Sequence, residues 1–121
     1  QIQDDVLDLT GSESTVGKSV GKDLEKGKLT LPLLMHLARA QGADRADFLA
    51  LLDQACGTGP TRQTSAEQIA RIVAQSGALD SARDEARRRI NLAKAALATL
   101  PQTGARRLLE LMADAVVTRA F

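Results

Sequence analysis

From Leu31 to the end of the chain, apolar residues recur three and four positions apart, and alternation with a period of two is scarce. Spacings of three and four place side chains on one face of an α-helix, whereas a half-buried strand needs a period of two. The chain has no Trp or Tyr and only two Phe, so its core must be built from Leu, Ile, Val and Ala, which favours closely packed helices. The predicted fold class is therefore all-α.

Glycine and proline divide this periodic region into separate helices, because neither residue sustains a helix interior. Ser65 and Gln68 have the spacing of a capping box at the start of one helix, and Thr103 can cap the last one. The expected helices cover residues 31–41, 44–55, 65–77, 80–100 and 103 onward, with a loop over 56–61.

Two apolar seams mark the faces that these helices are expected to bury. Residues of the fourth helix that step by three and four are Ala82, Ala86, Ile90, Ala93, Leu97 and Leu100. The expected buried side of the last helix consists of Leu108, Leu111, Met112, Ala115 and Val116. His36 is interpreted as a structural residue of the first of these helices, and Cys56 as a small packing residue.

Charge and cysteine content narrow the possible classes of function. Sixteen basic and 15 acidic residues give a net charge of +1, so no overall field favours nucleic acid or an anionic membrane. The single cysteine, Cys56, has no partner for an internal disulfide, which fits a reducing cytosol. No apolar stretch approaches the roughly 20 residues that a membrane span requires. We therefore expect a soluble, cytoplasmic protein with no transmembrane segment and no nucleic-acid partner.

Three carboxylates crowd the beginning of the chain. If residues 1–9 are helical, Asp4 and Asp8 lie four positions apart and Asp5 and Asp8 three apart, on one side of about one turn. Like charges at this spacing repel, so a bound cation would stabilise the arrangement, and carboxylate oxygens are ligands of Mg²⁺. An exposed acidic turn without a ligand is an equally good interpretation of these three residues alone.

A lysine-rich stretch follows directly. Four of the five lysines, Lys18, Lys22, Lys26 and Lys28, fall within eleven residues and alternate with glycines at positions 17, 21 and 27. Glycine lets the backbone approach a ligand closely, and lysine binds phosphate oxygens as a compact point charge. An acidic turn facing this stretch would form a receptor for a metal-chelated diphosphate. The alternative from the residues alone is a solvated loop of mixed charge.

These motifs together resemble a known family. Asp4-Asp5-Val6-Leu7-Asp8 is similar to the second aspartate-rich motif, D-D-x-x-D, of trans-isoprenyl diphosphate synthases, and Gln1 matches the glutamine of F-Q-x-x-D-D. Residues 17–32 match the family pattern G-K-x-x-G-x-D-L-x-x-G-K-x-T-L-P at every fixed position. Residues 77–101 and 117–119 resemble octaprenyl and solanesyl diphosphate synthases more loosely. The resemblance implies that residues 1–121 are the C-terminal part of a polyprenyl synthase domain, within an isoprenoid-synthase helical bundle.

The resemblance also implies a role for each matching residue. Magnesium bridging to the diphosphate of the allylic substrate would be held by Asp4 and Asp8 with Asp5 assisting, and Asp23 would bind a metal-bound water. The diphosphate itself would be bound by Gln1, Lys18, Lys28 and Arg119. No catalytic nucleophile is implied, because in this family the allylic carbon–oxygen bond ionises and isopentenyl diphosphate attacks the resulting carbocation.

The implied function is prenyl-chain elongation by a homodimeric, magnesium-dependent prenyltransferase acting on an allylic diphosphate and isopentenyl diphosphate. The first aspartate-rich motif of the family is absent from residues 1–121, so we expect these residues alone to be inactive and to work with the remainder of a synthase chain. Two alternatives stay open: a non-catalytic partner subunit of a heteromeric synthase, and a helical interaction module whose charged residues only pair on the surface.

Overall fold

The computed structural model describes residues 1–11 and 20–118, and these ranges contain helices and no strands. The helices are α1 (Ile2–Thr10), α2 (Lys22–Glu25), α3 (Leu31–Arg39), α4 (Gly42–Cys56), α5 (Arg62–Gln75), α6 (Ala78–Leu97) and α7 (Gly104–Thr118). The all-α prediction is confirmed. None of the described helices is both long enough and apolar enough to span a membrane.

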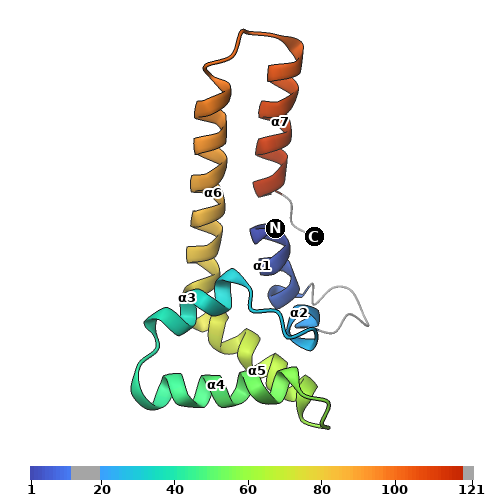
Figure 1. Ribbon diagram of the computed structural model, residues 1–121, viewed down its shortest axis with the longest axis vertical. Coiled ribbons are helices and arrows are strands. Elements are labelled where there is room, and N and C mark those ends of the chain that lie inside the picture. Colours follow the sequence, from blue (N-terminus) through green and yellow to red (C-terminus); the bar gives the residue numbers. More distant parts are fainter. Residues whose placement is uncertain (12–19, 119–121) are drawn as a thin grey trace.

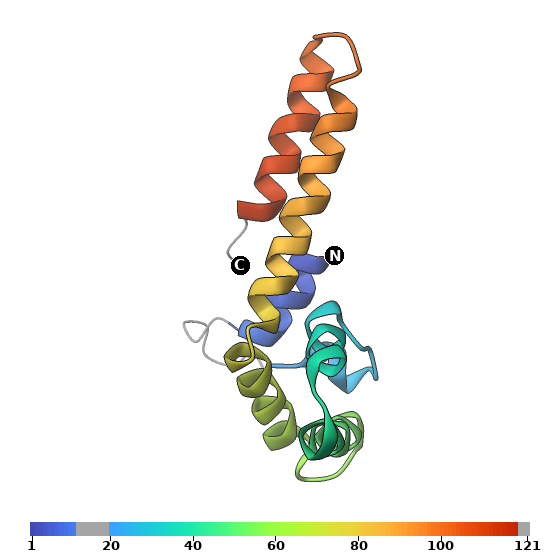
Figure 2. The same ribbon diagram turned by 90° about the vertical axis from the view of Figure 1, so that its left-hand side faces the viewer.

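The helices form a compact base with one long projecting hairpin. In Figure 1, α4 and α5 lie at the bottom, α3 lies above them, and α6 rises from this base beside α1. Figure 2 shows α7 returning antiparallel along the upper part of α6. The acidic N-terminal helix is therefore held next to the lower part of α6 and close to the free end of α7, where Ile2 and Val117 line one shared pocket.

The hydrophobic core occupies the base. Its largest fully buried side chains come from α1, α2, α3, α4 and α5, namely Val6, Leu24, Leu33, Phe48, Ile69 and Val73. Buried alanines at the start of α6, Ala78 and Ala82, let this helix approach α3 and α1 closely. The core thus joins α1 and α2, which carry the charged motifs, to the helices that follow.

Several predicted helix ends differ from those observed. Helix α5 begins at Arg62, so Ser65 lies inside it and donates a hydrogen bond of 3.0 Å to Oε1 of Gln54 on α4. The capping-box prediction was wrong, because the helix begins before Ser65 and the Ser65 hydroxyl bonds to Gln54 instead of to the backbone of its own helix. The Thr103 cap is confirmed, since its hydroxyl accepts a hydrogen bond of 3.2 Å from the backbone N–H of Arg106.

The predicted burial of the last helix is also wrong for the described part of the chain. No residue of α7 is buried, and Leu108, Leu111 and Met112 are each more than half exposed. In the seam predicted for the preceding helix, Ala82 and Ala86 are buried but Ala93 is exposed, and Leu100 is exposed beyond the end of α6 at Leu97. Periodicity indicates which side chains share a face, but it does not indicate whether another element covers that face.

Cys56 is exposed at the end of α4, so its interpretation as a packing residue is wrong. The preceding Ala55 is fully buried. Because successive helical residues point about 100° apart, the packing position belongs to Ala55, and the cysteine side chain is turned toward solvent.

Candidate functional site

The acidic residues of α1 face a segment that comes later in the chain. Helix α1 is anchored by Val6 and Leu9, which are 1% and 4% exposed. Within the same helix Asp4 is exposed, Asp5 is buried and Asp8 is partly buried. We call residues 20–28 the lysine segment; it contains α2 and lies against α1. The acidic turn and the described part of the lysine-rich stretch therefore lie close together, as predicted.

Lys28 is the lysine that reaches the acidic turn. Its Nζ lies 3.2 Å from Oδ1 of Asp5 and 3.5 Å from Oδ2 of Asp23. The hydrogen bond to Asp5 is the main reason why the pKa of the Lys28 ammonium is raised above its ordinary value, although desolvation opposes the shift. Gln1 Nε2 donates to the same Asp5 oxygen at 2.7 Å. Gln1, Asp5, Asp23 and Lys28 thus form one connected polar cluster.

Asp8 holds the beginning of α2. Its carboxylate oxygens accept hydrogen bonds from the backbone N–H groups of Lys22 and Asp23, at 3.2 and 3.1 Å. These N–H groups belong to the first turn of a helix, where no intrahelical acceptor exists. Helix α2 was not predicted from the sequence, because a four-residue helix has no periodicity to detect and its N-terminal partner is 14 residues upstream.

Gly21 lets the chain turn tightly into α2. Its φ of 82° lies in the left-handed region, which favours glycine. A Cβ at this position would lie 3.2 Å from the Cβ of Ala66 and 3.3 Å from Cδ1 of Leu24. The glycine in the lysine-rich pattern therefore serves close packing of the lysine segment against α5, in addition to any approach to a ligand.

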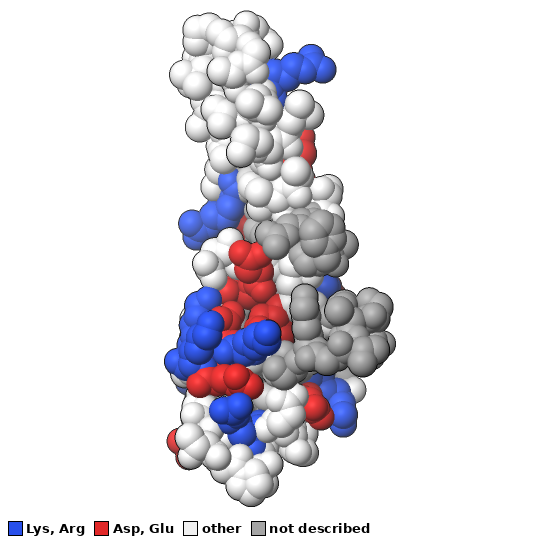
Figure 3. Space-filling model, turned by 90° about the vertical axis from the view of Figure 1, so that its right-hand side faces the viewer, with Lys and Arg blue, Asp and Glu red and all other residues white. Residues whose placement is uncertain are grey.

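Opposite charges meet on one face of the molecule. Figure 3 shows acidic side chains gathered near the middle of this face, with basic side chains directly beside and across them.

Mg²⁺ usually takes only one or two protein carboxylates and completes its shell with water and phosphate oxygens. Asp4 and Asp8, one turn apart with part of each residue exposed, fit that requirement chemically. Within residues 1–11 and 20–118, no group of three or more metal-ligating side chains converges on one point.

The predicted site residues thus differ in where the structure places them. The structure brings Gln1, Asp5, Asp23 and Lys28 together, and it places Asp8 against α2. Asp4 lies on the same helix as Asp5 and is exposed. Lys18 and Arg119 lie outside the described residues.

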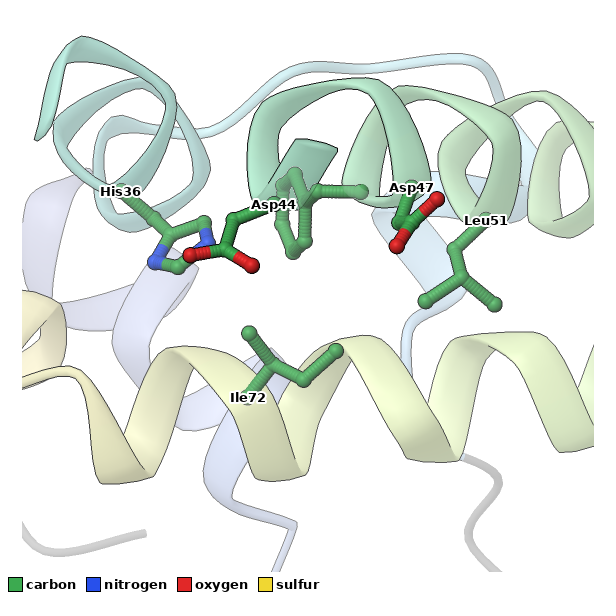
Figure 4. Close-up of a pocket in the computed structure, with 6 residues that line it drawn as sticks. His36, Asp44, Asp47, Leu51 and Ile72 are labelled. Atoms are coloured by element: carbon green, nitrogen blue, oxygen red, sulfur yellow. The ribbon is translucent and has the colours of Figure 1, made fainter. Parts of the chain in front are cut away.

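A hollow lies among α3, α4 and α5, and none of the residues of the polar cluster lines it. It has a volume of about 350 Å³, and Figure 4 shows side chains from these three helices around it. Its lining residues are His36, Asp44, Asp47, Phe48, Leu51 and Ile72. The His36 ring packs against Phe48 with a centroid distance of 4.3 Å, as expected for a structural residue. Burial lowers the pKa of His36, and the nearby Asp44 partly opposes that shift.

The lowered pKa of His36 predicts a dependence of stability on pH. Because the unfolded chain binds a proton at His36 more readily than the folded chain does, acidification through about pH 6.5 favours unfolding. In His36→Gln, this contribution disappears. We expect the melting temperature to fall less between about pH 7.5 and about pH 5.5 in the variant than in the wild type, as measured by circular dichroism. Equal decreases in the two proteins would contradict the prediction.

The helical fold and the paired charged motifs define the class of this chain as an isoprenoid-synthase type of helical bundle. The chain belongs to the polyprenyl synthetase family, whose model matches residues 1–73. No solved structure matches the chain.

Relatives with assigned activities cover nearly the whole chain. It is 40% identical to the all-trans-nonaprenyl-diphosphate synthase (geranyl-diphosphate specific) of Rhodobacter capsulatus, over 90% of this chain and 32% of the relative. It is 36% identical to the octaprenyl diphosphate synthase of Haemophilus influenzae, over 100% of this chain and 35% of the relative. A short chain isoprenyl diphosphate synthase of Methanothermobacter thermautotrophicus is also 36% identical, over 98% of this chain and 35% of the relative. The chain therefore spans about one third of the length of these relatives.

Proposed function

We propose that the protein containing this chain is a trans-prenyl diphosphate synthase and that residues 1–121 supply the part of its active site that binds the allylic diphosphate. The observation that carries this proposal is the contact between the two charged motifs, in which Lys28 of the lysine segment lies 3.2 Å from Asp5 of the acidic helix. Family membership supports it, because relatives with prenyl diphosphate synthase activity align over most of the chain.

The proposed roles follow from the charge of the leaving group. When the allylic carbon–oxygen bond breaks, the diphosphate gains negative charge, so cationic groups beside it stabilise the transition state more than the ground state. Lys28, together with Lys18, Gln1 and Arg119, is proposed to bind diphosphate oxygens. The double bond of isopentenyl diphosphate then forms the new carbon–carbon bond at the allylic carbon, and a proton is released.

Magnesium is the proposed cofactor, with Asp4 and Asp8 as its carboxylate ligands and Asp23 binding through a water. When bound, the metal supplies further positive charge to the departing diphosphate. The hydrogen bonds that Asp8 accepts from α2 at 3.1 and 3.2 Å support this role, because they orient its carboxylate while leaving lone pairs on both oxygens.

The wider assignment is also part of this proposal. We propose allylic diphosphate and isopentenyl diphosphate as substrates, a homodimer as the assembly, and the cytosol as the compartment. The relatives are named for products from the short-chain class to the nonaprenyl class. Neither the relatives nor the geometry favours a non-catalytic partner subunit.

Ligand binding can be tested without turnover. Magnesium with inorganic pyrophosphate should raise the melting temperature of the complete protein, because a ligand that binds only the folded state stabilises that state. At a hundredfold excess of ligand over its dissociation constant, the free energy of unfolding rises by about 2.7 kcal/mol. Differential scanning fluorimetry with magnesium alone, pyrophosphate alone and both together measures this effect. No change with both ligands would support the alternative in which the charged residues only pair on the surface.

A further inference from the structure

Asp5 differs from the other two aspartates of its motif. Its side chain is 7% exposed, whereas Asp4 is exposed and Asp8 is partly buried. One of its oxygens, Oδ1, accepts hydrogen bonds from both Gln1 Nε2 at 2.7 Å and Lys28 Nζ at 3.2 Å. Lys28 lies 23 positions further along the chain, so this contact joins the acidic helix to the far end of the lysine segment.

We propose that Asp5 is a positioning residue that holds the ammonium group of Lys28, and that it is not a metal ligand. The inference rests on the proposed function and assigns a separate role to one residue of its site. This role differs from the one that the family resemblance implies, in which Asp5 assists Asp4 and Asp8 in holding magnesium.

Burial is the first reason for this assignment. A buried carboxylate is costly unless it is paired with a cation and hydrogen-bonded, and Asp5 has both kinds of partner. Magnesium gives up its waters reluctantly and keeps several of them in a protein site. A ligand must therefore face a hydrated space. The positions of Asp4 and Asp8 provide one, whereas the side chain of Asp5 is nearly excluded from solvent.

The donor capacity of Lys28 is the second reason. An ammonium group carries three N–H donors, and Lys28 has two carboxylates within 3.5 Å, those of Asp5 and Asp23. With these two contacts made, one donor is left, and the Lys28 side chain is 44% exposed. Asp5 and Asp23 thus fix the ammonium group in advance with one N–H available for a diphosphate oxygen, which reduces the ordering cost of binding.

The main test compares Asp5→Asn with Asp4→Asn in the complete protein. With pyrophosphate saturating, the magnesium concentration at half-maximal thermal stabilisation should change by no more than about twofold in Asp5→Asn and rise about tenfold or more in Asp4→Asn. With magnesium saturating, pyrophosphate affinity should fall about tenfold in Asp5→Asn. A residue with only a structural role would not separate these two quantities. An equal rise in the magnesium requirement of both variants would overturn the proposal.

A double-mutant cycle tests the pairing without any ligand. Asp5→Asn and Lys28→Met should each lower the melting temperature of the complete protein, and the double variant should lose clearly less than the sum of the two losses. Additive losses would show that the residues are not coupled and would overturn the inference. If magnesium and pyrophosphate do not change the melting temperature of the wild-type protein, the proposed function is contradicted. The double-mutant cycle would still decide whether Asp5 and Lys28 act as a pair.

Discussion

Asp4→Ala in the complete protein is expected to lower the turnover number by about 10²- to 10³-fold, which corresponds to about 2.7–4 kcal/mol of lost transition-state stabilisation. Asp4 is the most exposed aspartate of the acidic turn and a proposed ligand of magnesium. Its loss should also raise the magnesium concentration required for activity. Initial rates with an allylic diphosphate and isopentenyl diphosphate, measured across a range of magnesium concentrations, determine both quantities.

Asp47→Ala is a matched control for this experiment. Asp47 is also an exposed aspartate on a helix, but it lies on α4 and lines the separate hollow that contains His36. Its removal deletes the same charge without touching the acidic turn, so turnover should stay close to that of the wild type. Unchanged turnover and unchanged magnesium dependence in Asp4→Ala would count against the proposed function.

Phe48→Ala is expected to cause a large loss of stability. Phe48 heads the fully buried side chains by volume, is 2% exposed, and packs against the His36 ring. Replacing it removes apolar contacts and leaves a cavity, which typically costs about 3–5 kcal/mol. The free energy of unfolding, measured by urea denaturation of the complete protein and monitored by circular dichroism, should fall by about this amount.

The neighbouring Leu49 provides the comparison for Phe48→Ala. It lies on the same helix and is 46% exposed, so Leu49→Ala removes a large apolar side chain that is only partly packed. We expect a loss of about 1 kcal/mol or less. Similar losses in the two variants would contradict the assignment of Phe48 to the core.

Much of the helical architecture could be predicted from local patterns. The helix expected from Leu31, the helix end near Gly77 and the cap at Thr103 depend on neighbouring residues, and the structure contains all three. The helix over the first residues was only assumed in the sequence analysis, and the structure contains it as α1. Helix α2 could not be predicted, because Asp8 supplies its N-terminal acceptor from another helix. The partner of Ser65 was missed for the same reason, since Gln54 lies on the adjacent α4.

The sequence by itself determined the fold class and the family, and it indicated which charged residues to expect in a candidate site, because helix periodicity and motif spacing are local properties of the chain. Only the tertiary structure distinguished Asp4 from Asp5. Adjacent residues on a helix point about 100° apart, and the surrounding helices bury one carboxylate against Lys28 while leaving the other exposed. Which of two identical side chains meets solvent depends on packing across the fold, and a sequence pattern does not encode that difference.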